Sequence, residues 1–89
     1  MPIAYHSRAS SIVVSGTDIH RPRGQYSTDK INPSYGETQS LDFELEIATV
    51  IGKDSKMGYP VKVNEAEEYI FGYTLLNDWS CRDVLAWEI

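Results

Sequence analysis

The sequence predicts a β-rich α+β fold with two short helices, and three features of its second half support this class. Residues 41–48 alternate between apolar side chains and acidic or small ones, which is typical of a strand with one face on a core. Residues 70–76 are aliphatic and aromatic, as expected for a second strand. Helix-start signals occur at Asn64 and at Ser80.

The N-terminal half contains fewer signals of regular structure. The β-branched run Ile12–Val14, closed by Ser15 and Gly16, predicts a short strand that ends in a turn. Thr17–Ser40 is rich in Pro, Gly, Ser, Asn and charged residues and predicts a long loop. A loop of that length is uncommon in a small domain, so it indicates either a functional segment or a missing packing partner.

The second half of the sequence predicts several strands that follow one another closely. The alternating strand 41–48 continues into Val50–Gly52, and a polar turn separates it from a short strand at 61–63. The strand 70–76 is apolar enough to be well buried.

Two capping boxes predict the helices. Asn64 with Glu67 opens a brief helix, and Ser80 with Asp83 opens a second one. The second helix reaches Ile89 without a C-cap signal, which suggests truncation.

Composition excludes several classes of function. The 89 residues include 13 acidic and 8 basic side chains, a formal charge of −5, which argues against binding to nucleic acid or to an anionic membrane surface. No apolar run approaches the about 18 residues of a spanning helix, and no signal peptide is recognisable. The single cysteine rules out an internal disulfide. We therefore expect a soluble, cytoplasmic protein.

The acidic residues of the alternating strand are the first candidate site. Asp42, Glu44 and Glu46 fall two residues apart, so they point to one face of the strand. Flexible Glu side chains can bring two carboxylates onto one ion, and all-oxygen ligands suit Ca²⁺ or Mg²⁺. The spacing alone favours the simpler interpretation, in which the charges keep one strand face in water.

Asp78 is the second candidate. It follows a hydrophobic stretch and precedes Trp79, a setting in which an unpaired carboxylate would be costly to bury. It pairs either with a cation or, as a helix-start cap, with backbone N–H groups, and the pattern leaves both open. Joined to Glu44 and Glu46, it completes a hypothetical divalent-cation site.

Other reactive residues carry weaker signals. Histidines in polar loops and a cysteine near a helix start are more often surface or packing residues than catalytic groups. These weaker candidates are His6, His20 and Cys81.

The chain resembles the fumarylacetoacetate hydrolase family over essentially its whole length. The resemblance rests on stretches in matching order, with an E-x-E element and an N-D-x-S-x-R-D element among them: Tyr5–Thr17, Arg21–Gln25, Leu41–Glu46, Ile70–Gly72, Asn77–Val84 and Trp87–Glu88. It implies that residues 1–89 are an incomplete, inner piece of the family's catalytic domain, which is a mixed β-sandwich-like roll.

The resemblance also implies a function. The family hydrolyses the C–C bond of 4-fumarylacetoacetate to fumarate and acetoacetate, in tyrosine and phenylalanine breakdown, with Ca²⁺ and Mg²⁺ as cofactors. By motif, Glu44, Glu46 and Asp78 correspond to metal ligands and Tyr5 to a substrate-binding tyrosine. Family members are homodimers, so a homodimer is expected of the full-length protein.

Departures from the family pattern limit this expectation. No residue of the chain matches the family's catalytic histidine, so we expect the chain alone to be inactive. Leu85 and Ile89 stand where the family has substrate-contacting glutamine and tyrosine, and Ser7 replaces a glycine. The alternatives are therefore a piece of a related acylpyruvate or diketone hydrolase, or a non-catalytic product that binds a cation or pairs with a family subunit.

Overall fold

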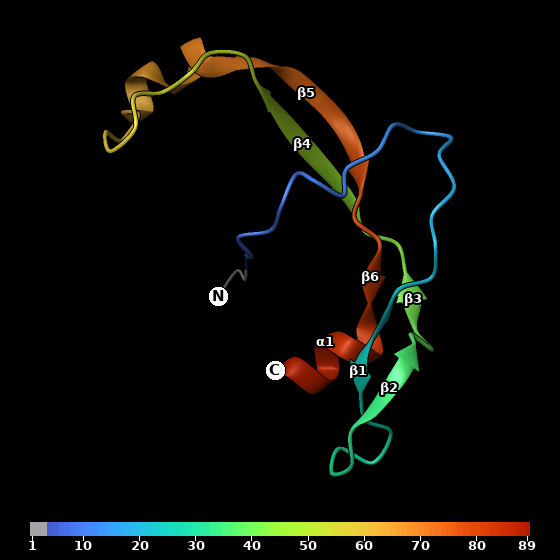
Figure 1. Cartoon of the computed structure of the whole chain (residues 1–89). Coiled ribbons are helices and arrows are strands. Elements are labelled where there is room, and N and C mark those ends of the chain that lie inside the picture. The colour runs from blue at the N-terminus through green and yellow to red at the C-terminus, as the bar shows by residue number, and fades with distance from the viewer. Residues whose placement is uncertain (1–3) are drawn as a thin grey trace.

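The computed structural model describes residues 4–89, which form six short strands and two helices (Figure 1). The elements in chain order are β1 Arg23–Tyr26, β2 Ser34–Glu37, β3 Leu41–Asp42, β4 Leu45–Ile51, the 3₁₀ helix η1 Val63–Tyr69, β5 Ile70–Asn77, β6 Ser80–Cys81 and α1 Arg82–Glu88. The β-rich α+β prediction with two short helices is confirmed.

The strands form three antiparallel pairs: β1 with β2, β3 with β6, and β4 with β5. The β4–β5 ribbon extends away from the end of the molecule that holds the other strands and α1 (Figure 1). Between β3 and β4 the chain changes its pairing partner from β6 to β5. The opposite side of the ribbon makes the matching change between β5 and β6. This exchange of partners is where the candidate carboxylates lie.

The described residues bury no hydrophobic side chain, and Thr38, at 1% exposure, is the one buried residue among them. The radius of gyration is 17.1 Å, whereas a compact domain of this length has a radius of about 12 Å. The accessible surface of 8192 Å² exceeds by about half the roughly 5,300 Å² expected for a compact chain of this mass. The sheets are therefore open, and the sandwich-like roll stays a prediction.

The single strand predicted over 41–48 is divided in two. β3 ends at Asp42, whose Oδ1 accepts a hydrogen bond from the backbone N–H of Phe43 (2.9 Å). The next strand then pairs with β5, while β3 pairs with β6. A carboxylate that binds its neighbour's N–H competes with the ladder at that point, which explains the break.

The N-terminal predictions need two corrections. Ile12–Val14 forms no strand, although the turn at Ser15–Gly16 is present, with Gly16 at φ 89° and a hydrogen bond from Thr17 N to Val14 O. The loop predicted over Thr17–Ser40 contains the hairpin β1–β2. Its strands lack hydrophobic alternation, so the pattern did not indicate them.

Tertiary packing accounts for that hairpin. Helix α1 lies against β1, and a Cβ built on Gly24 would stand 3.2 Å from Val84 Cγ2. A helix packed this closely stabilises a strand whose own residues have little β propensity.

The helices begin at other residues than the capping boxes predicted. Helix η1 has Lys62 and α1 has Cys81 at the N-cap, and neither cap makes a side-chain hydrogen bond. Residues 61–63 form no strand, because η1 already begins at Val63. The strand predicted over 70–76 is confirmed as β5.

The predicted burial of β5 is wrong for this structure. One face of the β4–β5 ribbon exposes large apolar side chains: Leu45, Ile47, Phe71, Tyr73 and Leu75. They are accessible because no second layer packs on the ribbon within residues 4–89. In the same range, no helix is long and apolar enough to cross a membrane.

Candidate metal centre

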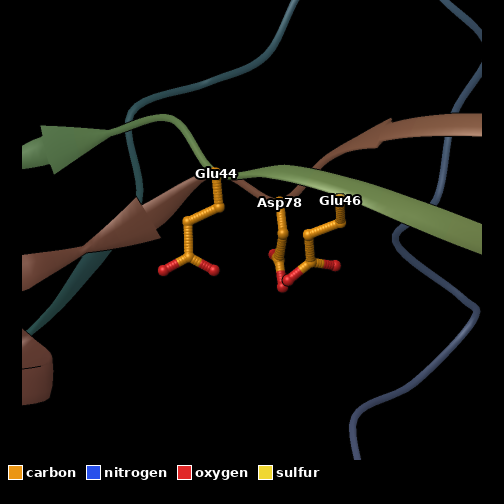
Figure 2. A group of neighbouring side chains, drawn as sticks. All are labelled: Glu44, Glu46 and Asp78. Carbon is orange, nitrogen blue, oxygen red and sulfur yellow. The ribbon is translucent and has the colours of Figure 1, made fainter.

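Three carboxylates converge where β4 and β5 end. Glu44, Glu46 and Asp78 each offer an oxygen, and these oxygens lie within 4.8 Å of one another. Figure 2 shows the three side chains projecting from the same side of the ribbon, with one carboxylate oxygen of Glu44 directed toward Asp78. The predicted trio is thus brought together, and its role as a set of metal ligands stays a prediction.

The strand register explains the convergence. Leu45 pairs with Asn77 at the end of the β4–β5 ladder, so Glu44 and Asp78 flank that pair. Two further hydrogen bonds extend the ladder past its end: Asp78 N donates to Glu44 O (3.0 Å), and Glu44 N donates to the side-chain Oδ1 of Asn77 (3.2 Å). Glu46 lies two residues along β4 and therefore points to the same face as Glu44.

Asp42 does not join the trio, in contrast to the same-face pattern of the sequence. The strand break at Phe43 turns Asp42 toward Arg82, whose Nε lies 3.3 Å from Asp42 Oδ2. The alternation of side chains between two faces holds only within a continuous strand. Because the strand is interrupted at Phe43, only Glu44 and Glu46 point to the same face as predicted.

Arg82 bridges the two carboxylates on either side of that break. Its Nη1 donates to Glu44 Oε1 at 2.5 Å, and its backbone N–H donates to Ser40 O at 2.9 Å. The hydrogen bond to Glu44, and after it the one to Asp42, raise the pKa of Arg82 above its ordinary value because both favour the charged guanidinium. The spacing of residues in the sequence did not indicate which carboxylates Arg82 contacts.

The predicted burial of Asp78 is wrong, because its side chain is exposed. It does not cap α1 either, since Cys81 occupies the N-cap. Of the two interpretations left open by the sequence, the structure disfavours the cap. A half-buried Glu44 beside an exposed Asp78 makes the cluster reachable from solvent.

Asp83 ties the start of α1 to the segment before β3. Its Oδ1 accepts hydrogen bonds from the Thr38 hydroxyl and from Val84 N (3.0 Å), and its Oδ2 accepts one from Gln39 N (2.7 Å). Together with the Arg82 backbone contact, this holds the residue pair 82–83 in place. The capping box predicted from Ser80 and Asp83 is wrong, because Asp83 accepts hydrogen bonds from Thr38, Gln39 and Val84 and not from Ser80.

The pH dependence of this tie is testable. Partial burial acts to raise the pKa of Asp83, but the hydrogen bonds from Thr38, Gln39 and Val84 outweigh it, and the net pKa is lowered. Because the folded pKa is depressed, the stabilisation is present above the unfolded value of about 3.9 and is lost as pH falls through the lower folded value.

We therefore expect the NMR signal of the Gln39 backbone amide proton to shift with pH, with the midpoint of the titration below about pH 3.9. Asp83→Asn removes this titration. A midpoint at or above the unfolded value would contradict the proposed tie.

An open cleft of about 1440 Å³ runs beside the trio. Its lining includes all three carboxylates, Tyr5 and Leu85. Tyr5 is exposed at 66%, so its hydroxyl is accessible to a molecule in the cleft. Of the weaker candidates, His20 and Cys81 line the cleft and His6 does not.

The donor set fits a hard divalent cation. Carboxylate oxygens are preferred ligands of Ca²⁺ and Mg²⁺, and three acidic groups within 4.8 Å repel one another unless a cation compensates them. The chemistry of the donors therefore agrees with the cofactors expected from the sequence, without distinguishing the two ions.

Comparisons with known proteins point in the same direction. The family model "Fumarylacetoacetate (FAA) hydrolase C-terminal" matches residues 1–89. The chain is 56% identical over 89 residues to the fumarylacetoacetase of Arabidopsis thaliana, 52% to that of Oryza sativa subsp. japonica and 49% to that of Homo sapiens. Each alignment covers 99% of the chain, but the chain spans only 21% of the length of each relative.

Proposed function

The chain belongs to the fumarylacetoacetate hydrolase family, and we propose that it supplies the cation-binding part of an enzyme that hydrolyses the C–C bond of 4-fumarylacetoacetate to fumarate and acetoacetate. The observation that carries the proposal is the convergence of Glu44, Glu46 and Asp78 from two segments of the chain. The name fumarylacetoacetase, borne by the similar proteins, supports the choice of substrate.

The trio would hold Ca²⁺ or Mg²⁺ at the wall of the cleft. When bound, such a cation supplies positive charge that attracts a diketo acid and stabilises negative charge on its oxygens. Tyr5 lines the same cleft, and its hydroxyl can donate a hydrogen bond to a substrate oxygen. These residues bind and orient the substrate, and none of them takes the proton of an attacking water in this proposal.

The hydrolytic step needs a base that we do not assign to this chain. His6 does not line the cleft, and neither histidine matches the family's catalytic one. We therefore propose that the chain alone is inactive and that activity requires the remainder of the relatives' length. The proposal also includes a cytoplasmic location and a homodimer, as the family resemblance implies.

A segment-swap protein tests this function. In it, the 89 residues replace the matched segment of the Arabidopsis relative, to which they are 56% identical. We expect hydrolysis of fumarylacetoacetate, its loss with a chelator and its return on addition of Ca²⁺ or Mg²⁺. A folded segment-swap protein that turns over the substrate equally well after chelation would reject the cation-binding role.

A related diketone or acylpyruvate hydrolase is the second candidate, and Leu85 supports it. Leu85 lines the cleft with an aliphatic side chain where the family has a polar residue, which alters the surface offered to a substrate. Faster hydrolysis of an acylpyruvate than of fumarylacetoacetate by the segment-swap protein would favour this candidate. Cation binding without hydrolysis of either compound would favour the non-catalytic alternative.

A further inference from the structure

The guanidinium of Arg82 lies next to the candidate metal centre without being one of its ligands. It contacts Glu44 Oε1 at 2.5 Å and Asp42 Oδ2 at 3.3 Å. Its own position is restrained by the backbone hydrogen bond to Ser40 O and by the start of α1. Arg82 is therefore held from several sides and can in turn restrain the side chain that it contacts.

Glu44 needs such a restraint more than Glu46 does. It lies in the irregular stretch between β3 and β4, outside both ladders, whereas Glu46 belongs to β4. A Glu side chain has three rotatable bonds, and ordering it costs rotamer entropy. A carboxylate has two oxygens, so Glu44 can bind Arg82 through Oε1 and keep Oε2 for a cation.

We propose that Arg82 is a positioning residue of the candidate metal centre, which orients Glu44 toward Glu46 and Asp78. This inference rests on the proposed cation-binding function. Charge is consistent with it: Asp42, the three carboxylates and Arg82 sum to −3, so a divalent cation offsets most of the remaining negative charge. Mutation of a residue that hydrogen-bonds to a metal ligand commonly lowers metal affinity by about 10- to 100-fold.

The positive charge of Arg82 also repels a cation, so a single substitution would mix two opposing effects. The double variant Arg82→Gln/Asp42→Asn separates them, because it removes one positive and one negative charge and leaves the net charge unchanged. The matched control is Arg23→Gln/Glu37→Gln, which removes another exposed pair, with Nη1 and Oε1 3.7 Å apart, in β1 and β2.

Calorimetric titration with CaCl₂ and with MgCl₂ tests the proposal in the full chain and in the segment-swap protein, with circular dichroism to compare folding. We expect the Arg82/Asp42 double variant to bind Mg²⁺ about tenfold more weakly or worse, and Ca²⁺ less affected. Mg²⁺ demands near-ideal octahedral geometry, whereas Ca²⁺ tolerates irregular ligands, so misplacing one ligand shifts the selectivity. The single variant Arg82→Lys, which keeps the positive charge, should bind Mg²⁺ more tightly than the double variant and more weakly than the unaltered protein.

Two results overturn the positioning role: a double variant that binds both ions like the unaltered protein, or an equal loss for both ions that the Arg23/Glu37 control shares. If neither the unaltered chain nor the unaltered segment-swap protein binds either ion, the proposed function itself fails. The two failures are therefore distinguishable.

Discussion

Replacing Asp78 by Asn is expected to weaken binding of Ca²⁺ and Mg²⁺ in the segment-swap protein by about 100-fold. Asp78 is the only member of the trio that comes from the segment after β5, so without its charge the site consists of two carboxylates from neighbouring positions of one segment. The affinity falls because the site has fewer charged ligands and because no carboxylate remains on the side of the site that follows β5.

Calorimetry gives the dissociation constants, and hydrolysis of fumarylacetoacetate at a fixed cation concentration gives the consequence for activity. Asp54→Asn is the matched control, because Asp54 is also an exposed aspartate but lies in the loop after β4. If Asp54→Asn lowers the affinity as much as Asp78→Asn does, the effect is one of overall charge and the trio is not a site. Undiminished affinity in Asp78→Asn would lead to the same conclusion.

Purified by themselves, the 89 residues are expected to unfold with little heat absorption. A globular chain of this length absorbs about 60 kcal/mol near 60 °C. That heat comes largely from packed interiors, and residues 4–89 bury no hydrophobic side chain. Ordered structure should persist mainly around Thr38, where Asp83 and Arg21 supply hydrogen bonds.

Differential scanning calorimetry measures the enthalpy, and a fluorescent dye that binds exposed apolar surface reports the open β4–β5 face. The segment-swap protein is the control, since there the relative's remaining residues are available to cover that face, and we expect dye binding to fall. A sharp transition with the full enthalpy in the 89-residue chain would contradict the prediction and show that the apolar face is covered in solution.

The local elements were predictable because they depend on near neighbours. The aliphatic and aromatic run of β5 indicates a strand whatever its surroundings, and the acidic and apolar pattern around Asn64 indicates a short helix. The alternation at Glu44 and Glu46 correctly indicated one shared face. The position of Asp78 after a hydrophobic stretch added it to them as a hypothesis, and the family resemblance implied the same three residues.

Burial was not predictable in the same way. An apolar residue such as Tyr73 or Leu75 signals that a face prefers to be covered, but whether another layer lies over it depends on parts of the molecule far from it in sequence. In this structure the ribbon face is open, so the expected burial of β5 and of Asp78 was wrong. The capping box at Ser80 and Asp83 failed for a related reason: Asp83 accepts hydrogen bonds from Thr38 and Gln39, which are distant in sequence, instead of serving as a simple local cap.

The sequence by itself determined that acidic side chains share a strand face, that a strand and two short helices follow, and to which family the chain is related. Only the tertiary structure decided that the strand breaks at Phe43, that Asp42 turns to Arg82, and that Arg82 reaches Glu44 across 38 positions of sequence. The physical reason is that periodicity and propensity act over a few residues. A contact between distant residues depends on which strands pair and in which register, and here β3 and β4 pair with different strands.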